Sequence, residues 1–319
     1  MISKIDSIEQ NNLEKQILLS IKNRSETINC LFHKLENVKT VLSILLSEHP
    51  EVFYVFDFEL KVIKNRVEIK PKYTYSKKEI QTLSSLCQEK AKRIIRDAEK
   101  FISEYEKVCY IHDALSKTIK YSNSKGKESH TIIGALIYGQ AVCDGYAKAF
   151  KYLLDNTSIE SLIVTGTACN IRSIKHESHS WNMVKICGKW CHIDLTFNTS
   201  IRINDCLRYD YFGINNAQIK PDHAFDESIY PHSIGNDLEY YRRNHLFINS
   251  IQDIKKVLIT LLSGRNTNIV FRLSSLVKTK DIEKKLQTII LEAAKQKKYY
   301  GNYQYSFNKY QNVIQIYFT

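Results

Sequence analysis

Apolar residues recur every three or four positions in several stretches of the chain, which is the spacing of a helix with one buried face. Other stretches are shorter, alternate or run continuously apolar, and end at turn residues, as strands do. The expected helices cover residues 8–30, 35–47, 77–96, 105–121, 251–262 and 281–297. The expected strands cover residues 161–166, 179–186, 189–195, 268–273, 303–307 and 313–318, and a hairpin within 53–69 that turns at Asn65. This mixture predicts an α+β protein.

The order of these elements divides the chain into three parts. Residues 1–103 form a helical and hairpin extension, residues 104–235 a central core, and residues 236–319 a small α/β domain with the order helix, strand, helix, strand, strand. The chain has only 10 Gly and four Pro, and no Gly/Ser-rich or Pro-rich linker separates the parts. We therefore expect a fully folded chain whose parts pack on one another.

Cys143 stands at the start of an expected helix in the central part. It follows Gly139, and apolar residues at helical spacing run from Tyr146 to Leu154. At a helix N-terminus, the dipole and the unpaired N–H groups stabilise a thiolate, which is the reactive form of cysteine. The backbone N–H of Cys143 is also the preferred candidate to hold an oxyanion, with Tyr121 and Gln140 as weaker candidates.

His179 and Asp194 fall on two strands that a tight turn at residues 187–188 joins. With the two-residue period of a strand, His179 and Trp181 share one face, as do Trp190 and Asp194. The Asp194 carboxylate can then accept the imidazole N–H of His179, fix its tautomer and stabilise the imidazolium. Cysteine, histidine and aspartate follow one another here in the order that papain-like cysteine enzymes use.

Three motifs carry a resemblance to a known family: A-V-C-D-G-Y-A at 141–147, H-S-W-N at 179–182 and W-C-H-I-D at 190–194. They resemble the transglutaminase-like superfamily of papain-fold cysteine enzymes, and its bacterial members in particular. The resemblance extends from about Leu45 to His232. It implies a helix that carries the cysteine, packed on an antiparallel sheet that carries the histidine and the aspartate.

Carried over to this sequence, the resemblance makes Cys143 the nucleophile, His179 the base and Asp194 the group that orients the base. Tyr121, Gln140, Trp181 and Trp190 are expected to line the substrate cleft. The departures from the family pattern are mild: Ala141 replaces a glycine, Cys191 an aromatic residue and Phe197 a tryptophan. None of them removes a catalytic atom.

The expected enzyme is a cysteine-dependent amide hydrolase, a peptidase or amidase that forms a thioester acyl-enzyme. A protein-glutamine transamidase with the same triad is the first alternative, since both reactions share the first step. The aromatic residue lost at Cys191 and the smaller ring at Phe197 favour hydrolysis, because a transamidase needs walls that keep water out. The second alternative is a catalytically idle binding or scaffold module of the same fold.

A zinc site is the competing interpretation of the same region. Its candidate ligands would be His176, His179, Cys187, Cys191 and His192. The H-E-S-H run at 176–179 is one residue short of the H-E-x-x-H spacing, so no metal or other cofactor is expected. His192 lies on the Asp194 face but two residues away along the strand, which favours a packing role over that of the base. His130 and His223 match family positions, with no chemical role assigned to them.

The formal net charge of +12 comes mostly from evenly spread lysines. Without an aromatic and basic recognition motif, this charge does not predict nucleic acid binding, and the expected partner is a protein or peptide substrate. No apolar leader and no membrane-spanning stretch is visible, and the eight cysteines lack disulfide framework spacing. These features predict a cytoplasmic protein, or an exported one if a leader has been removed; the oligomeric state stays open.

Overall fold

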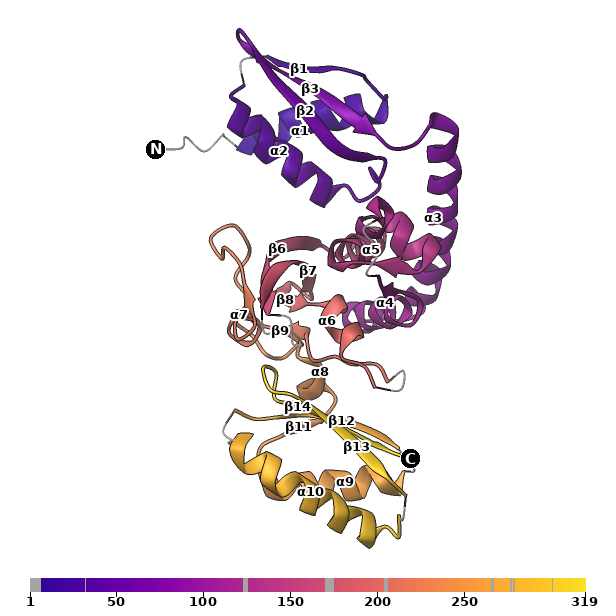
Figure 1. The fold of residues 1–319 in the computed structure, drawn as a ribbon, viewed down its shortest axis with the longest axis vertical. Coiled ribbons are helices and arrows are strands. Elements are labelled where there is room, and N and C mark those ends of the chain that lie inside the picture. Colours follow the sequence, from indigo (N-terminus) through magenta and orange to yellow (C-terminus); the bar gives the residue numbers. More distant parts are fainter. Residues whose placement is uncertain are drawn as a thin grey trace. The chain divides into compact units, whose positions relative to one another are not determined.

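The computed structural model describes residues 7–31, 33–122, 126–169, 175–203, 206–264, 267–275, 277, 279–299 and 301–319 (Figure 1). Residues 1–6, from which the absence of a leader was judged, lie outside this description. The chain divides into two compact units, Met1–Ile163 and Val164–Thr319, and each is described by itself. Both units contain helices and sheets, which confirms the predicted α+β class.

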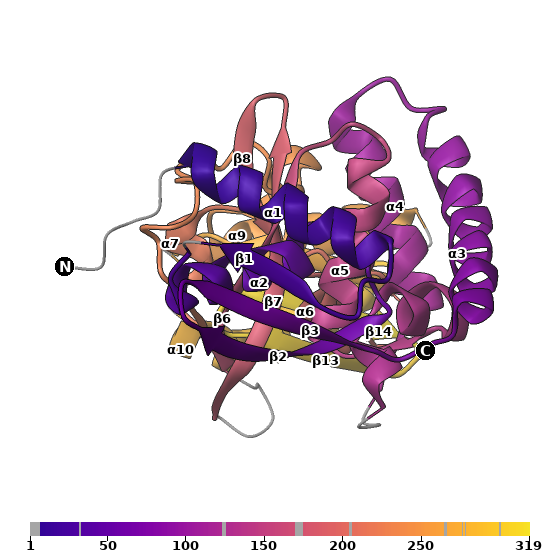
Figure 2. The same cartoon turned by 90° about the horizontal axis from the view of Figure 1, so that it is seen from above.

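The N-terminal unit begins with a three-stranded antiparallel sheet, in the order β1-β3-β2, and two helices. Val67 and Ile69 of β3 are buried whereas their neighbours on the other face are more exposed, so the helices cover one face of the sheet (Figure 2). The helix expected over residues 8–30 is wrong at its end, because the chain turns at Arg24 (φ 56°) and Cys30 lies in a strand. The elements are α1 (Ser7–Lys22), β1 (Ile28–Leu31), α2 (Leu35–Glu48), β2 (Val55–Ile63) and β3 (Arg66–Tyr73).

The rest of this unit is mainly helical. A capping box at Ser76 starts its longest helix: the Ser76 hydroxyl accepts from the Glu79 N–H, and the Glu79 carboxylate accepts from the Ser76 N–H. The next two helices occur where the sequence predicts them, within a few residues. The elements are α3 (Lys77–Ala98), α4 (Glu104–Thr118), β4 (Lys120–Tyr121), the 3₁₀ turn η1 (Lys127–His130), the π turn η2 (Gly134–Tyr138), β5 (Gln140–Ala141) and α5 (Cys143–Asp155).

A five-stranded sheet, in the order β10-β6-β7-β8-β9, forms the first half of the C-terminal unit. The predicted hairpin is present: β7 and β8 are antiparallel, and the turn uses Cys187 and Gly188, both with positive φ. Gly188, at φ 78°, suits this turn because it has no Cβ to clash. The elements are β6 (Ser161–Cys169), β7 (His176–Ile186), β8 (Lys189–Ile193), α6 (Leu195–Ser200), β9 (Phe212–Ile214), α7 (Asn216–Ile219), β10 (His223–Ala224) and α8 (Tyr240–Arg243).

A second sheet follows, in the order β11-β12-β14-β13, with two helices that pack their apolar residues against it (Figure 1). The predicted order of helix, strand, helix, strand, strand is confirmed, and β11 is an additional short strand that pairs in parallel with β12. The three-part division at residues 103 and 235 stays a prediction. The elements are β11 (Phe247–Ile248), α9 (Ile251–Ser263), β12 (Asn268–Leu273), α10 (Thr279–Gln296), β13 (Tyr303–Asn308) and β14 (Val313–Phe318).

Candidate active site

Cys143 is the first residue of α5, as predicted, and its side chain is half-buried. The preceding residue, Val142, is extended and donates its N–H to the Ser129 carbonyl at 3.0 Å. A Cβ on Gly145 would lie 2.3 Å from that same carbonyl oxygen, so only glycine lets the first turn of α5 approach so closely. The spacing of Cys143 and Gly145 in the motif therefore fixes where the helix begins.

The next motif residue, Tyr146, holds the start of this helix against the interior of the unit. Tyr146 is fully buried, and its hydroxyl donates to the Ile119 carbonyl at 2.9 Å, next to the end of α4. Ala147 is buried as well. The first turn of the helix that begins at Cys143 is thus held on two sides.

Charged groups and a cavity lie beside this helix start in the N-terminal unit. Lys148 pairs with Asp144 at 2.8 Å and also donates to the His130 carbonyl at 3.2 Å. Burial raises the pKa of the Asp144 carboxyl, but the hydrogen bond from His130 and the charge of Lys148 outweigh it and lower that pKa. A cavity of about 320 Å³ is lined by these residues together with Phe56 and Tyr75, among others.

His179 and Asp194 are in direct contact in the C-terminal unit. His179 Nε2 lies 2.6 Å from Asp194 Oδ2, and the side chains are 8% and 0% exposed. The register explains the contact, since the Asn182–Ile193 pair places Trp181 across from Asp194 and His179 two residues farther along the same face. The other carboxylate oxygen of Asp194 accepts from the Phe197 N–H at 2.9 Å and caps α6.

The electrostatics of this pair favour an ionised carboxylate. Burial alone would raise the pKa of Asp194, but the charge of His179 and the hydrogen bonds that Asp194 accepts lower it well below its usual value. A carboxylate accepts only, so the proton in the 2.6 Å contact belongs to Nε2 of His179. Nδ1 is then the ring nitrogen whose lone pair could accept a proton.

His223, to which the sequence assigned no role, is a second partner of Asp194. Its Nε2 lies 3.0 Å from the same Oδ2 atom, and its Nδ1 lies 2.7 Å from Asp222 Oδ1. The short strand β10 brings it there by pairing with β6, where His223 lies opposite Ala168. Asp222 was not identified from the sequence at all. The sequence signal that could have identified it is its place directly before a histidine at a position that matches the family pattern.

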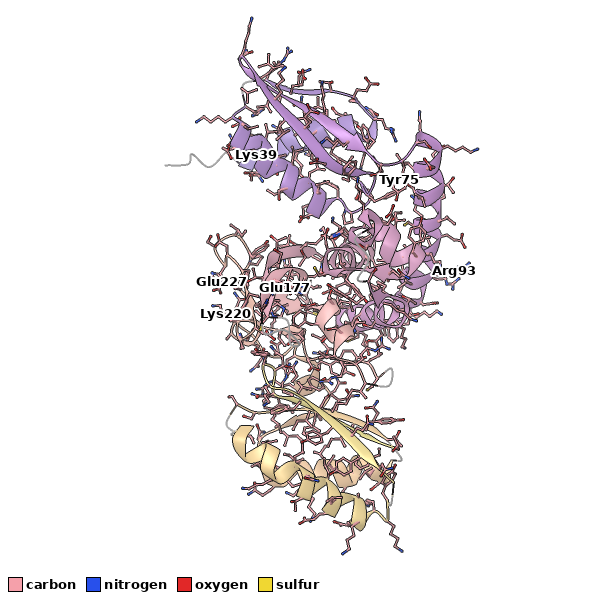
Figure 3. The ribbon with its side chains drawn as sticks, viewed as in Figure 1. Lys39, Tyr75, Arg93, Glu177, Lys220 and Glu227 are labelled. Carbon is pink, nitrogen blue, oxygen red and sulfur yellow. The ribbon has the colours of Figure 1, made fainter. Side chains whose placement is uncertain are left out.

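His192 binds Trp181 and Asn216, and it is His179 that contacts Asp194. Nδ1 of His192 accepts from the Trp181 indole N–H at 3.0 Å, and its Nε2 donates to Asn216 Oδ1 at 3.0 Å. Burial lowers the pKa of His192 to about 4, so this ring is neutral. Asn216 is held in turn by Glu227, which also pairs with Lys220 near the surface (Figure 3).

The four expected cleft residues differ in exposure. Tyr121 is 50% exposed and Gln140 is exposed, and their short strands β4 and β5 pair in parallel. Trp190 is partly buried, with Lys185 Nζ 5.8 Å from its ring centre. Trp181 is only 1% exposed and stacks on His179, with centroids 5.9 Å apart. Trp181 therefore supports His179 and presents almost no surface to a substrate, unlike the expected cleft wall.

The described residues contain one trio that could hold a divalent metal ion: His179, Asp194 and His223. Their N–O distances of 2.6 and 3.0 Å are hydrogen-bond distances, in which a proton joins the two atoms. In the zinc cluster considered above, Cys187 is exposed on the hairpin turn while Cys191 is buried against the Val184 carbonyl. Hydrogen bonding therefore accounts for the trio.

Among the described residues, no helix has the length and apolar character that a membrane crossing requires. No curated protein matches the chain. Three solved structures are similar in part. A TGase shares 14% identity at a TM-score of 0.33, over 57% of this chain and 53% of that one. A candidate cysteine protease from Cytophaga hutchinsonii shares 17% identity at a TM-score of 0.29, over 44% of this chain and 62% of that one, and a candidate protease from Parabacteroides distasonis ATCC 8503 shares 11% identity at a TM-score of 0.28, over 44% of this chain and 39% of that one. The chain thus spans about half of the TGase that it matches.

The family model of the transglutaminase-like superfamily matches residues 88–195. This segment runs from within α3 through α5 and both strands of the hairpin, so it includes Cys143, His179 and Asp194. Residues 88–195 of the chain are therefore a transglutaminase-like core.

Proposed function

We propose that the protein is a cysteine-dependent amide hydrolase in which Cys143 is the nucleophile, His179 the base and Asp194 the orienting carboxylate. The observation that carries the proposal is the buried 2.6 Å contact between His179 and Asp194, inside the segment that the family model matches. A buried carboxylate that fixes one nitrogen of a histidine is the arrangement that prepares the other nitrogen for proton transfer.

The reaction would proceed in two halves. His179 Nδ1 takes the thiol proton of Cys143, and the thiolate attacks the amide carbonyl carbon. The C–N bond breaks, the amine leaves with the proton from His179, and a thioester remains. In the second half, a water molecule gives a proton to His179 and its oxygen attacks the thioester carbon; the C–S bond breaks, His179 returns the proton to the Cys143 sulfur, and the carboxylic acid leaves.

The start of α5 supports the same role for Cys143. The 13-residue helix directs the positive end of its dipole, and the N–H groups of its first turn, toward the thiol and an acyl oxygen bound to it. Asp194 stays anionic at neutral pH, because its pKa is lowered, and it stabilises the imidazolium of His179. We propose a protein or peptide as the substrate, with the cavity beside Asp144 taking one of its side chains.

A transamidase is the second candidate, since the family whose model matches is transglutaminase-like. Both reactions form the same thioester and differ in whether water or a lysine amine attacks it. Replacement of an aromatic residue by Cys191, and of a tryptophan by the smaller Phe197, favours access of water, and hence hydrolysis. An idle binding module would keep the fold without forming the thioester.

The test incubates the purified protein with a glutamine-containing peptide library and a labelled primary amine, and scores cleavage and amine incorporation together. Cys143→Ala should abolish product, and Cys109→Ala, which removes another half-buried thiol from helix α4, should retain it. Amine incorporation without cleavage would replace hydrolysis by transamidation. A folded Cys143→Ala variant with full activity would overturn the thioester mechanism.

A further inference from the structure

The contact between His223 and Asp222 continues into the interior of the C-terminal unit. The Tyr211 hydroxyl lies 2.5 Å from Asp222 Oδ2, and the Asn308 amide Nδ2 lies 3.2 Å from that hydroxyl and 2.9 Å from Asp210 Oδ2. All of these side chains are less than a tenth exposed. A continuous row of hydrogen bonds thus joins the second sheet, at the end of β13, to Asp194.

The chemistry of the partners fixes the direction of each hydrogen bond. Asn308 Oδ1 accepts from the Gln311 N–H, so the Nδ2 end faces Tyr211 and donates to it. Tyr211 must then donate its own proton to Asp222. Asp222 accepts at Oδ2, and at Oδ1 it faces His223 Nδ1, which therefore carries a proton.

The other nitrogen of His223 is determined in the same way. Nε2 faces Asp194 Oδ2, which already accepts from His179 and is acceptor-only as a carboxylate. His223 therefore has a proton on both nitrogens and is an imidazolium held between two carboxylates. A buried charge is tolerated when it is paired and fully hydrogen-bonded, as it is here.

We infer that His223 is a positioning residue that stays protonated, holds the Asp194 carboxylate in place for His179, and is itself held by Asp222, Tyr211 and Asn308. The inference rests on the proposed function, because it assigns a role to His223 in the reaction of His179. In this inference the second sheet contributes to the site, because its strand β13 carries Asn308, the last hydrogen-bond donor of the row.

The surroundings of His223 agree with a charged ring. Burial lowers the pKa of His223, but the hydrogen bonds and charges of Asp194 and Asp222 outweigh it and raise that pKa above its ordinary value. The other titratable groups near the ring are His179, 5.5 Å away between ring centres, Tyr211, also 5.5 Å away, and His192, which is neutral. Apart from its two carboxylates, aromatic rings such as Phe197 and Trp181 surround it.

The consequence for catalysis follows from the shared oxygen. Because His223 and His179 both donate to Oδ2, the carboxylate cannot rotate without breaking both bonds. A fixed carboxylate keeps Nδ1 of His179 aimed in one direction, which affects the chemical step and leaves substrate binding alone. Loss of the row should therefore lower kcat and leave KM nearly unchanged.

The protonation of His223 can be tested without any activity. In nitrogen-detected NMR of the inactive Cys143→Ala protein, with histidine labelled, His223 should show two protonated ring nitrogens from about pH 5.5 to 8.5. Asp222→Asn should let His223 lose one proton within that range. A neutral His223 at pH 7 in the Cys143→Ala protein would overturn the inference.

The positioning role is tested by Tyr211→Phe, which removes one hydroxyl and keeps the buried ring. We expect about a tenfold loss of kcat with KM unchanged, since a hydrogen bond to a charged group is lost. Asn308→Ala should act in the same direction, and Gln311→Ala is the matched control. Gln311 lies three residues away and also binds the first half of the unit, through the Gln218 carbonyl, without touching Tyr211.

The outcomes separate this inference from the proposed function. If Cys143→Ala is inactive and Tyr211→Phe and Asn308→Ala lose no more kcat than Gln311→Ala, the triad holds and the positioning role is wrong. If Cys143→Ala is active, the proposed function fails, while the NMR result still decides the protonation of His223. If Tyr211→Phe does not fold, the NMR comparison with Asp222→Asn decides in its place.

Discussion

Two histidines of the C-terminal unit, His192 and His223, are both buried but differ in charge: His192 is neutral, and we infer that His223 is an imidazolium. His192 is 0% exposed and His223 is 2% exposed. The partners of His192 are neutral, the Trp181 indole and the Asn216 amide, whereas both partners of His223 are carboxylates. Burial lowers the pKa of both rings, and only at His223 do partners outweigh it.

The comparison shows that the character of the hydrogen-bond partners, and not the depth of burial, sets the charge of a buried imidazole here. The two rings therefore affect stability with opposite signs as pH changes. The pKa of His192 is lower in the folded protein than in the unfolded chain, so this residue favours the folded state at pH values above its unfolded pKa. His223, with a raised pKa, stabilises it below its unfolded value, and this contribution is lost as pH rises through the folded pKa.

Asp194→Asn should have the largest effect, because it removes the charge that His179 and His223 share. Asparagine still caps α6, so the fold should remain, but it cannot stabilise two imidazolium groups. We expect kcat to fall by roughly a thousandfold or more. Steady-state kinetics with a reporter amide, together with the melting temperature, measures this. Near wild-type kcat in a folded Asp194→Asn protein would contradict the orienting role.

A change of pH should have the next largest effect, through His192. The unfolded chain takes up a proton at this residue below about pH 6.5, and the folded protein does so only near pH 4. The free energy of unfolding should therefore fall by about 3 kcal/mol from His192 alone as pH drops through this window. Urea unfolding at pH 7 and pH 4.5 measures the loss.

The His192→Gln variant should lose less stability across that window than the wild type. His176→Gln removes an exposed histidine and should keep the wild-type difference between the two pH values. Equal losses in all three proteins would mean that the pKa of His192 is the same in the folded and the unfolded state.

Trp181→Phe should have the smallest effect of the three changes. It keeps an aromatic ring beneath His179 but removes the indole N–H that His192 Nδ1 accepts. A buried acceptor left without its donor costs about 1–3 kcal/mol of unfolding free energy. Chemical denaturation at neutral pH measures it, and a loss larger than that of Trp181→Ala would be inconsistent with this cause.

Much of the transglutaminase-like core could be predicted from the sequence, because local signals carry it. Glycine at the turn and the alternation of strand residues predicted the hairpin, and the helical spacing after Cys143 predicted the start of α5. The contact between His179 and Asp194 followed from the hairpin, since two strands joined by a tight turn have a nearly fixed register.

Other features depend on contacts that no local pattern encodes. The apolar spacing of α1 continues past Lys22, so the end of the helix and the strand at Cys30 were missed. Neighbouring residues of a strand point to opposite faces, which argues against contact between Asp222 and His223; Asp222 instead precedes β10 in a turn. The other partner of His223, Asp194, is brought to it only by the order of strands in the five-stranded sheet.

The position of Asn308 has a consequence for biosynthesis. Asn308 is 97 residues beyond Tyr211, whereas His179 and Asp194 are 15 residues apart. A ribosome adds about 5–20 residues per second, so the last donor of the row is made several seconds after the pair that it supports. During that interval a nascent chain holds Cys143, His179 and Asp194 without Asn308. The ordering of Asp194 that we infer is therefore acquired late in translation.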